Sequence, residues 1–186
     1  MLFLSALCLV AACAPSSGPP AASAPRASVE WHRLRSTSER LLEAIREGTR
    51  KSPTFRAVVE DIESRDVVVY LLPGNCTTAT ARSCMTFLTR AGGIRYVLVR
   101  MSMRQSQPDL IAHVAHELTH AFEVADAPHV VDERTFRTFY EQRNYATCGR
   151  ACGYETETAV ATQRAVRHQL ARSRAGTASQ IARRRP

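Results

Sequence analysis

Two histidines and a glutamate in His116-Glu117-Leu118-Thr119-His120 have the types and spacing needed to hold a metal ion. Residues four apart on an α-helix lie on the same face, so His116 and His120 can direct their imidazole nitrogens at one point. Glu117 lies one step round the turn, where a carboxylate suits proton transfer from a metal-bound water. The spacing therefore predicts one zinc ion held by His116 and His120, with Glu117 as a general base.

The residues around this motif predict that it lies on a half-buried helix. The run from Leu110 to Val124 contains no Gly or Pro, and its apolar residues recur at a helical rather than an alternating period. Pro108 and Asp109 suit the first turn of a helix, because proline fits there and a negative charge interacts favourably with the helix dipole. A helix in this position would present both histidines to one side.

A catalytic zinc site needs a third protein ligand and an open position. The residues after His120 contain no further histidine at a suitable spacing, which leaves the downstream acids Glu155 and Glu157. On a helix starting near Tyr154, Glu155 would share a stripe with apolar or small residues and Glu157 with polar ones. We therefore favour Glu155 as the third ligand, with Glu157 as the alternate.

Other polar residues have weaker claims on this site. Glu123, one turn beyond His120, is a candidate hydrogen-bond acceptor for a ligand histidine, and Asp126 is a less well placed one. His113 is expected to be partly buried without binding metal. Tyr140 and Tyr145 could donate to an oxyanion, although a packing role suits them better.

The rest of the chain predicts an α+β domain. Helical spacing is found over 36–47, where Gly48 ends the pattern, and less clearly over 54–62. β-Branched runs at 66–72 and 94–100 predict strands, with a short one at 85–88. Further helices are expected over 132–144 and 154–172.

The motif and its downstream acid resemble those of a known enzyme class. His116-Glu-Leu-Thr-His120 with Tyr154-Glu155-Thr156 downstream resembles zinc metallopeptidases of the gluzincin type, in small bacterial exported proteins. The resemblance covers about residues 90 to 170. It implies a minimal zincin-like domain, in which a small, mostly antiparallel sheet packs on an active-site helix and a C-terminal ligand helix. It also implies that His116, His120 and Glu155 bind zinc and that Glu117 is the base.

Charge and composition limit the partners. The 186 residues are 45% hydrophobic and 23% charged, as in ordinary globular proteins. The net charge of +8 comes mostly from arginines beyond residue 163, so the body is close to neutral and nucleic-acid binding is not indicated. We expect a zincin-like domain over 29–172 and a basic, disordered tail over 173–186. No pattern specifies an oligomeric state.

The N-terminal segment predicts export to the cell envelope or periplasm. Residues 1–12 are apolar and resemble a signal peptide, and Val10-Ala-Ala-Cys13 resembles a lipobox in which Cys13 becomes lipidated. Residues 13–28 then form a Pro/Ser/Ala linker to the membrane. Cleavage at one of the alanines would instead release a soluble protein.

The remaining cysteines are consistent with an oxidising compartment. Four of them lie beyond the linker, an even number that suggests two disulfides. We favour the local pairs Cys76–Cys84 and Cys148–Cys152. The spacings fit a structural Cys₄ zinc site poorly.

Three functions are therefore open. The first is hydrolysis of a peptide or protein substrate by a membrane-anchored zinc metallopeptidase. The second is a non-catalytic zinc-binding envelope protein. The third is an interaction module whose basic tail binds an anionic surface.

Overall fold

The computed structural model describes residues 31–76, 81–142 and 154–183, with side chains up to residue 175. The signal peptide, linker, Cys13, Tyr145 and the Cys148–Cys152 pair lie outside the described residues. The described elements, in chain order, are β1 (Leu34–Arg35), α1 (Glu39–Lys51), α2 (Pro53–Glu63), β2 (Val67–Pro73), β3 (Ser83–Ala91), β4 (Ile94–Met101), α3 (Gln107–Ala125), α4 (Glu133–Gln142) and α5 (Glu157–Arg183).

The four strands form one mixed sheet in the order β1-β2-β4-β3. β2 pairs in parallel with both β1 and β4, and only β3 and β4 pair antiparallel. The α+β prediction is confirmed at this level, but the expectation of a mostly antiparallel sheet is wrong. The reason is the connection through α1 and α2, which carries the chain back so that β2 can run alongside β1.

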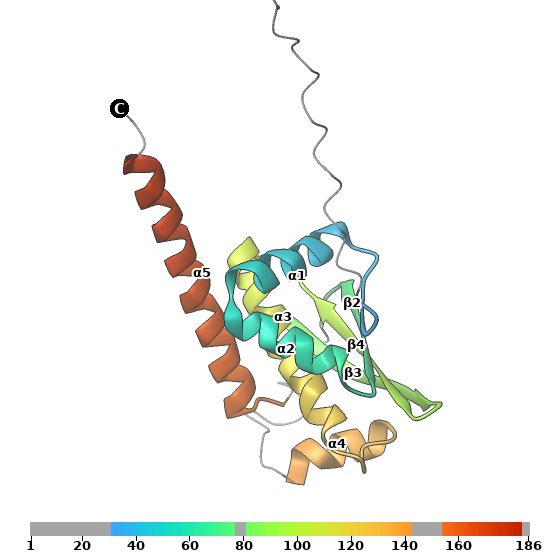
Figure 1. Cartoon of the computed structure of the whole chain (residues 1–186). Coiled ribbons are helices and arrows are strands. Elements are labelled where there is room, and N and C mark those ends of the chain that lie inside the picture. The colour runs from blue at the N-terminus through green and yellow to red at the C-terminus, as the bar shows by residue number, and fades with distance from the viewer. Residues whose placement is uncertain (1–30, 77–80, 143–153, 184–186) are drawn as a thin grey trace, which may run out of the picture. The chain divides into compact units, whose positions relative to one another are not determined.

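Helix α3 occupies the centre of the domain. It contacts β2, β3 and β4 on one side and α1, α2 and α5 on the others, so helices surround it where the sheet does not (Figure 1). The side chains that fill this interior are almost completely removed from solvent; among the largest are Tyr140, Phe55, Leu41, Ile45, Ile62, Leu71, Met101, Leu110 and Ile111. The helix that carries the motif is therefore packed against both the sheet and the surrounding helices.

The start of α3 follows the sequence prediction. Ser106 is the N-cap, and its side-chain oxygen accepts a hydrogen bond from the backbone N–H of Asp109. Pro108 lies in the first turn, where its missing N–H costs no helical hydrogen bond. None of the described helices is long and apolar enough to cross a membrane.

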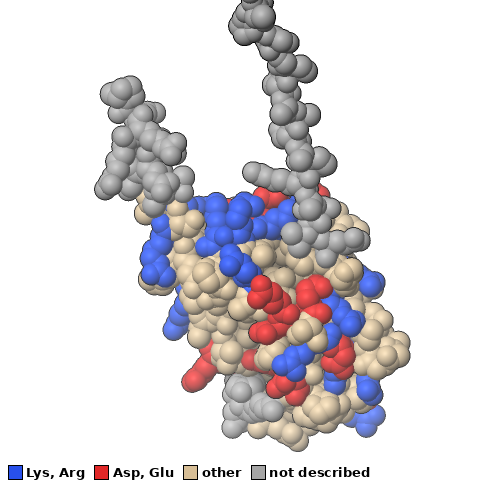
Figure 2. Space-filling view, viewed as in Figure 1, with Lys and Arg blue, Asp and Glu red and all other residues tan. Residues whose placement is uncertain are grey.

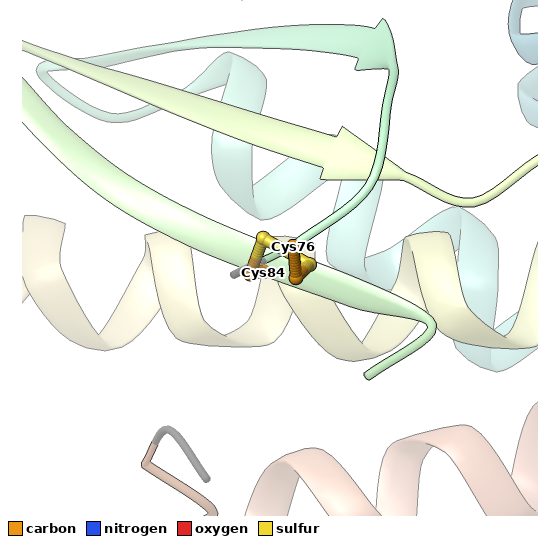
Figure 3. The surroundings of a disulfide bond; sticks show 2 residues. All are labelled: Cys76 and Cys84. Atoms are coloured by element: carbon orange, nitrogen blue, oxygen red, sulfur yellow. A yellow bond between two sulfur atoms is a disulfide. The ribbon is translucent and has the colours of Figure 1, made fainter. Parts of the chain in front are cut away.

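A disulfide joins Cys76, after β2, to Cys84 near the start of β3 (Figure 3). This pairing confirms the predicted local disulfide. It closes a short loop at the end of the sheet where β3 begins. β3 is longer than the short strand predicted at 85–88, because it pairs with β4 from Ser83 to Ala91 apart from an irregularity between Phe87 and Thr89.

Arg95 is a buried cation that ties the chain after α3 to the sheet. Its side chain pairs with Asp66 at 2.5 Å and donates hydrogen bonds to the carbonyl oxygens of Ala127 and Val130. Because a buried guanidinium needs several acceptors, these contacts fix the loop between α3 and α4 against β4. That loop directs α4 toward the end of α3.

Basic side chains gather toward α1 on the face shown in Figure 2, with acidic ones close by. Several of the charges on α1 are paired with each other: Arg46 with Glu39 and Glu43, and Lys51 with Glu47. Exposed pairs of this kind contribute little to stability. This part of the surface therefore carries ion pairs rather than a field of one sign.

The sequence pattern predicted that α1 ends at Gly48, and this prediction is wrong. Gly48 lies buried within the helix. A Cβ at this position would come within 2.8 Å of the Phe55 ring and 2.9 Å of Ile111. The helix continues past Gly48 because the glycine allows α1 to approach α2 and α3 closely. Packing against neighbours, rather than the local propensity of glycine, decides the structure here.

We predict that Gly48→Ala lowers the free energy of unfolding by about 1 to 3 kcal/mol, since overpacking outweighs the better helix propensity of alanine. Urea unfolding measures the change. Gly74→Ala is the matched control, because its nearest neighbour, at 3.3 Å, is the side chain of the exposed Arg100, which can move away. Equal effects of the two substitutions would contradict this account of Gly48.

Candidate metal centre

His116 and His120 are brought together by the central helix as their spacing predicts. Their Nε2 atoms lie 3.1 Å apart, and both residues are about 5% exposed. The ring planes are nearly perpendicular, at 81°. The two buried nitrogens therefore converge on one small region at the surface of α3.

Glu155 lies at the same point, from a distant part of the chain. Its carboxylate Oε2 is 3.5 Å from His116 Nε2, and its side chain is 40% exposed. Glu155 is not on a helix, because α5 begins only at Glu157, so the helical stripe used to favour it does not exist. The choice of Glu155 over Glu157 stays a prediction, which now rests on position, since Glu157 is exposed in the first turn of α5.

These separations suit the zinc ion that the motif implies. A tetrahedral zinc with bonds of about 2.0–2.1 Å separates its ligand atoms by about 3.3–3.4 Å, close to the 3.1 Å and 3.5 Å found here. In the described part of the chain, no three His, Cys, Asp or Glu side chains are yet grouped closely enough to hold a metal ion. The half-exposed Glu155 is the side chain that must turn inward to complete such a group.

His120 is oriented by a carboxylate on its own helix. Its Nδ1 lies 2.9 Å from Oε2 of Glu123, so the imidazole donates there and leaves the Nε2 lone pair facing His116. This is the arrangement by which an outer carboxylate fixes the tautomer of a metal-binding histidine. The predicted role of Glu123 thus has a direct geometric basis, whereas Asp126 is exposed and pairs with Arg65.

The pKa values of the two histidines are shifted in opposite directions. Burial, and then the nearby His120 and His113, lower the pKa of His116 to about 3. The pKa of His120 is raised, because the hydrogen bond to Glu123 and the charges of Glu117, Glu123 and Glu155 outweigh its burial. His116 is therefore neutral near pH 7, whereas the carboxylates around His120 favour positive charge at that residue.

Nδ1 of His116 has no hydrogen-bond partner of good geometry, although it is buried. The Ala159 backbone and the Gln163 side chain lie close enough to raise the pKa of this residue slightly against the effect of burial. A buried nitrogen without a partner is costly, so the position of Nδ1 is not stabilised by a hydrogen bond, in contrast to Nε2.

Glu117 is buried beside the two histidines, with only 4% of its surface exposed. Burial raises the pKa of its carboxyl, and the charge of His120 and a hydrogen bond from Ser83 oppose that shift. A carboxylate made more basic in this way, beside two histidines that could bind a metal, is suited to accept a proton. Ser83 at the start of β3 was not anticipated from the sequence.

Tyr140, which the sequence offered as a possible donor to an oxyanion, packs behind His120 instead. Tyr140 is 1% exposed, and its hydroxyl lies 3.3 Å from the carbonyl oxygen of His120 and 3.4 Å from Glu123. It packs against the ring of His120 and therefore supports that histidine from behind. His113 is half-buried and bonds to the carbonyl oxygen of Asp109, one turn from the site, as expected for a non-ligating residue.

Comparison of the chain with protein-family models, curated proteins and solved structures finds no match. The assignment of function therefore depends on the site itself.

We predict that the free energy of unfolding of the metal-free protein falls as the pH falls from about 6.5 toward 3, because the unfolded chain binds a proton at His116 more readily than the native state does. In this window the unfolded chain binds a proton at His116 that the native state does not bind, so each pH unit costs up to about 1.4 kcal/mol. Urea unfolding in chelator, compared between the wild type and His116→Gln, measures the difference, with His168→Gln on exposed α5 as control. A stability difference that stays constant with pH would contradict the prediction.

Proposed function

We propose that this protein is a zinc-dependent peptidase with a minimal gluzincin-like centre. The observation that carries the proposal is that His116 Nε2 lies 3.1 Å from His120 Nε2 and 3.5 Å from the Glu155 carboxylate, beside the buried Glu117. Two imidazoles and one carboxylate form the ligand set of catalytic zinc sites that keep one position open. One zinc ion per chain is expected.

Zinc, when bound at this position, supplies a Lewis acid that polarises a carbonyl group and acidifies a water molecule. Glu117 accepts a proton from the attacking water and returns it to the leaving amine. His120 is kept in the tautomer required for metal binding by Glu123, and Tyr140 packs behind both residues. The buried position of Glu117 limits solvent access to the transferred proton.

An extended peptide is the substrate class that the surrounding sheet favours. β3 stands at the end of the strand order, where its outer edge pairs with no described strand, and it contacts α3. An unpaired edge can add an extended peptide through main-chain hydrogen bonds. Ser83, which bonds to Glu117, lies at the start of the same strand. A peptide laid along β3 would therefore pass close to the proposed base.

The retention of a buried acid at Glu117 favours the enzyme over a non-catalytic zinc protein. A purely structural zinc site takes four protein ligands and needs no base. Export and lipidation at Cys13, with attachment of the domain to a membrane in the cell envelope, remain predictions from the N-terminal sequence.

We predict that Glu117→Gln retains zinc and lowers kcat/KM at least about 100-fold, because the amide cannot take the proton. The full chain is incubated with a mixed peptide library, cleavage is followed by mass spectrometry, and zinc is measured on the same samples. Glu157→Gln, at an exposed position of α5, is the control that should leave both properties unchanged. Cleavage by Glu117→Gln at the wild-type rate would contradict the role of Glu117, and a zinc-loaded wild type without cleavage would indicate the non-catalytic function.

A further inference from the structure

The segment that carries Glu155 is held by its two neighbours in sequence rather than by a helix. On one side, the ring of Tyr154 stacks on Tyr140, with centroids 5.1 Å apart and an angle of 13° between the planes. On the other side, the hydroxyl of Thr156 donates a 2.6 Å hydrogen bond to Oε1 of Glu123. Both anchors belong to the group of residues that supports His120.

Thr156 is the better defined of these anchors. It is 2% exposed, so its bond to Glu123 is shielded from water and stronger than an exposed one. Its oxygen also accepts a 3.1 Å hydrogen bond from the backbone N–H of Ala159, which makes it the N-cap of α5. The same side chain thus starts α5 and reaches back to α3.

Glu123 joins the two halves of the site through its two oxygens. Oε2 accepts from Nδ1 of His120 at 2.9 Å, and Oε1 accepts from Thr156. A carboxylate held at both oxygens is fixed in plane and direction, whereas one held at a single oxygen can rotate. Glu123 therefore links the orientation of His120 to Thr156.

We propose that Thr156 is a positioning residue that couples Glu155 to His120 through Glu123, so that the third zinc ligand and the His120 tautomer are set together. This inference rests on the proposed zinc site. Loss of the Thr156 hydroxyl leaves Oε1 of Glu123 without its donor and removes one of the two anchors of the Glu155 segment. Zinc affinity falls because two ligands lose their alignment at once.

The capping role of Thr156 must be separated from its bond to Glu123. Thr156→Val removes both interactions while keeping the shape of the side chain. Glu123→Ala removes the bond from Thr156 together with the bond from His120, and leaves the cap in place. The loss of the cap is the same whether or not Glu123 is present, so it cancels in a double-mutant cycle. What remains is the coupling through Glu123.

The test is zinc affinity of the full chain, measured by competition with a chromophoric chelator, for wild type, Thr156→Val, Glu123→Ala and the double variant. We expect Thr156→Val to weaken binding about 10- to 100-fold in the wild-type background and hardly at all beside Glu123→Ala. Thr156→Ser, which keeps the hydroxyl, should bind as the wild type does. Equal losses in both backgrounds, or no loss in either, would overturn the coupling.

A readout that needs no metal separates this proposal from the proposed function. In the metal-free protein, at a pH where His120 is neutral, the ring ¹⁵N shifts should report one tautomer, with the proton on Nδ1, and Thr156→Val should give a mixture. If no zinc binds but the tautomer still responds to Thr156, the metal site is disproved and the link between Thr156 and His120 stands. If Thr156→Val leaves the His120 tautomer unchanged, the link between Thr156 and His120 is overturned, whether or not zinc binds.

Discussion

The structure depends on the close approach of two imidazole nitrogens inside a protein. His116 and His120 place their Nε2 atoms 3.1 Å apart where both residues are almost fully buried. Two lone pairs at that distance repel each other unless a proton or a metal ion lies between them. The pKa of His120 is raised, because its hydrogen bond to Glu123 and the nearby carboxylates outweigh burial, while burial and the neighbouring histidines lower the pKa of His116 to about 3. The position is therefore suited to a cation before any ligand is named.

The remaining architecture keeps those nitrogens in place. Helix α3 is enclosed by the sheet and by α1, α2 and α5, with Gly48 allowing α1 to approach closely (Figure 1). Arg95 anchors the loop that leads to α4, and α4 supplies Tyr140 behind His120. Glu123 then connects His120 to Thr156, next to Glu155. Residues far apart in the sequence thus meet at one point through buried polar contacts, which are specific because each unpaired member would be costly.

The local part of this arrangement could be predicted from the sequence, but the non-local part could not. The spacing of His116, Glu117 and His120 and the first turn at Pro108 and Asp109 depend only on helical geometry, and the structure has them as expected. The parallel pairing of β2 and the burial of Gly48 depend on packing between distant segments, which periodicity does not report. Glu155 was favoured by a helical stripe that is absent, since α5 starts later and runs on to Arg183 rather than ending near Arg172. Thr156 could have been predicted as an N-cap if the start of α5 had been placed after it. Nothing in the sequence indicated that Ser83 would contact Glu117.

Zinc stoichiometry of the full chain tests the central claim most directly. Elemental analysis of the wild type beside His120→Ala, Glu155→Ala and Glu157→Ala should give about one zinc per chain for the wild type and for Glu157→Ala, and much less for the other two. This result would fix the ligand set as His116, His120 and Glu155. No zinc in the wild type after reconstitution, or loss of zinc with Glu157→Ala instead of Glu155→Ala, would contradict the account.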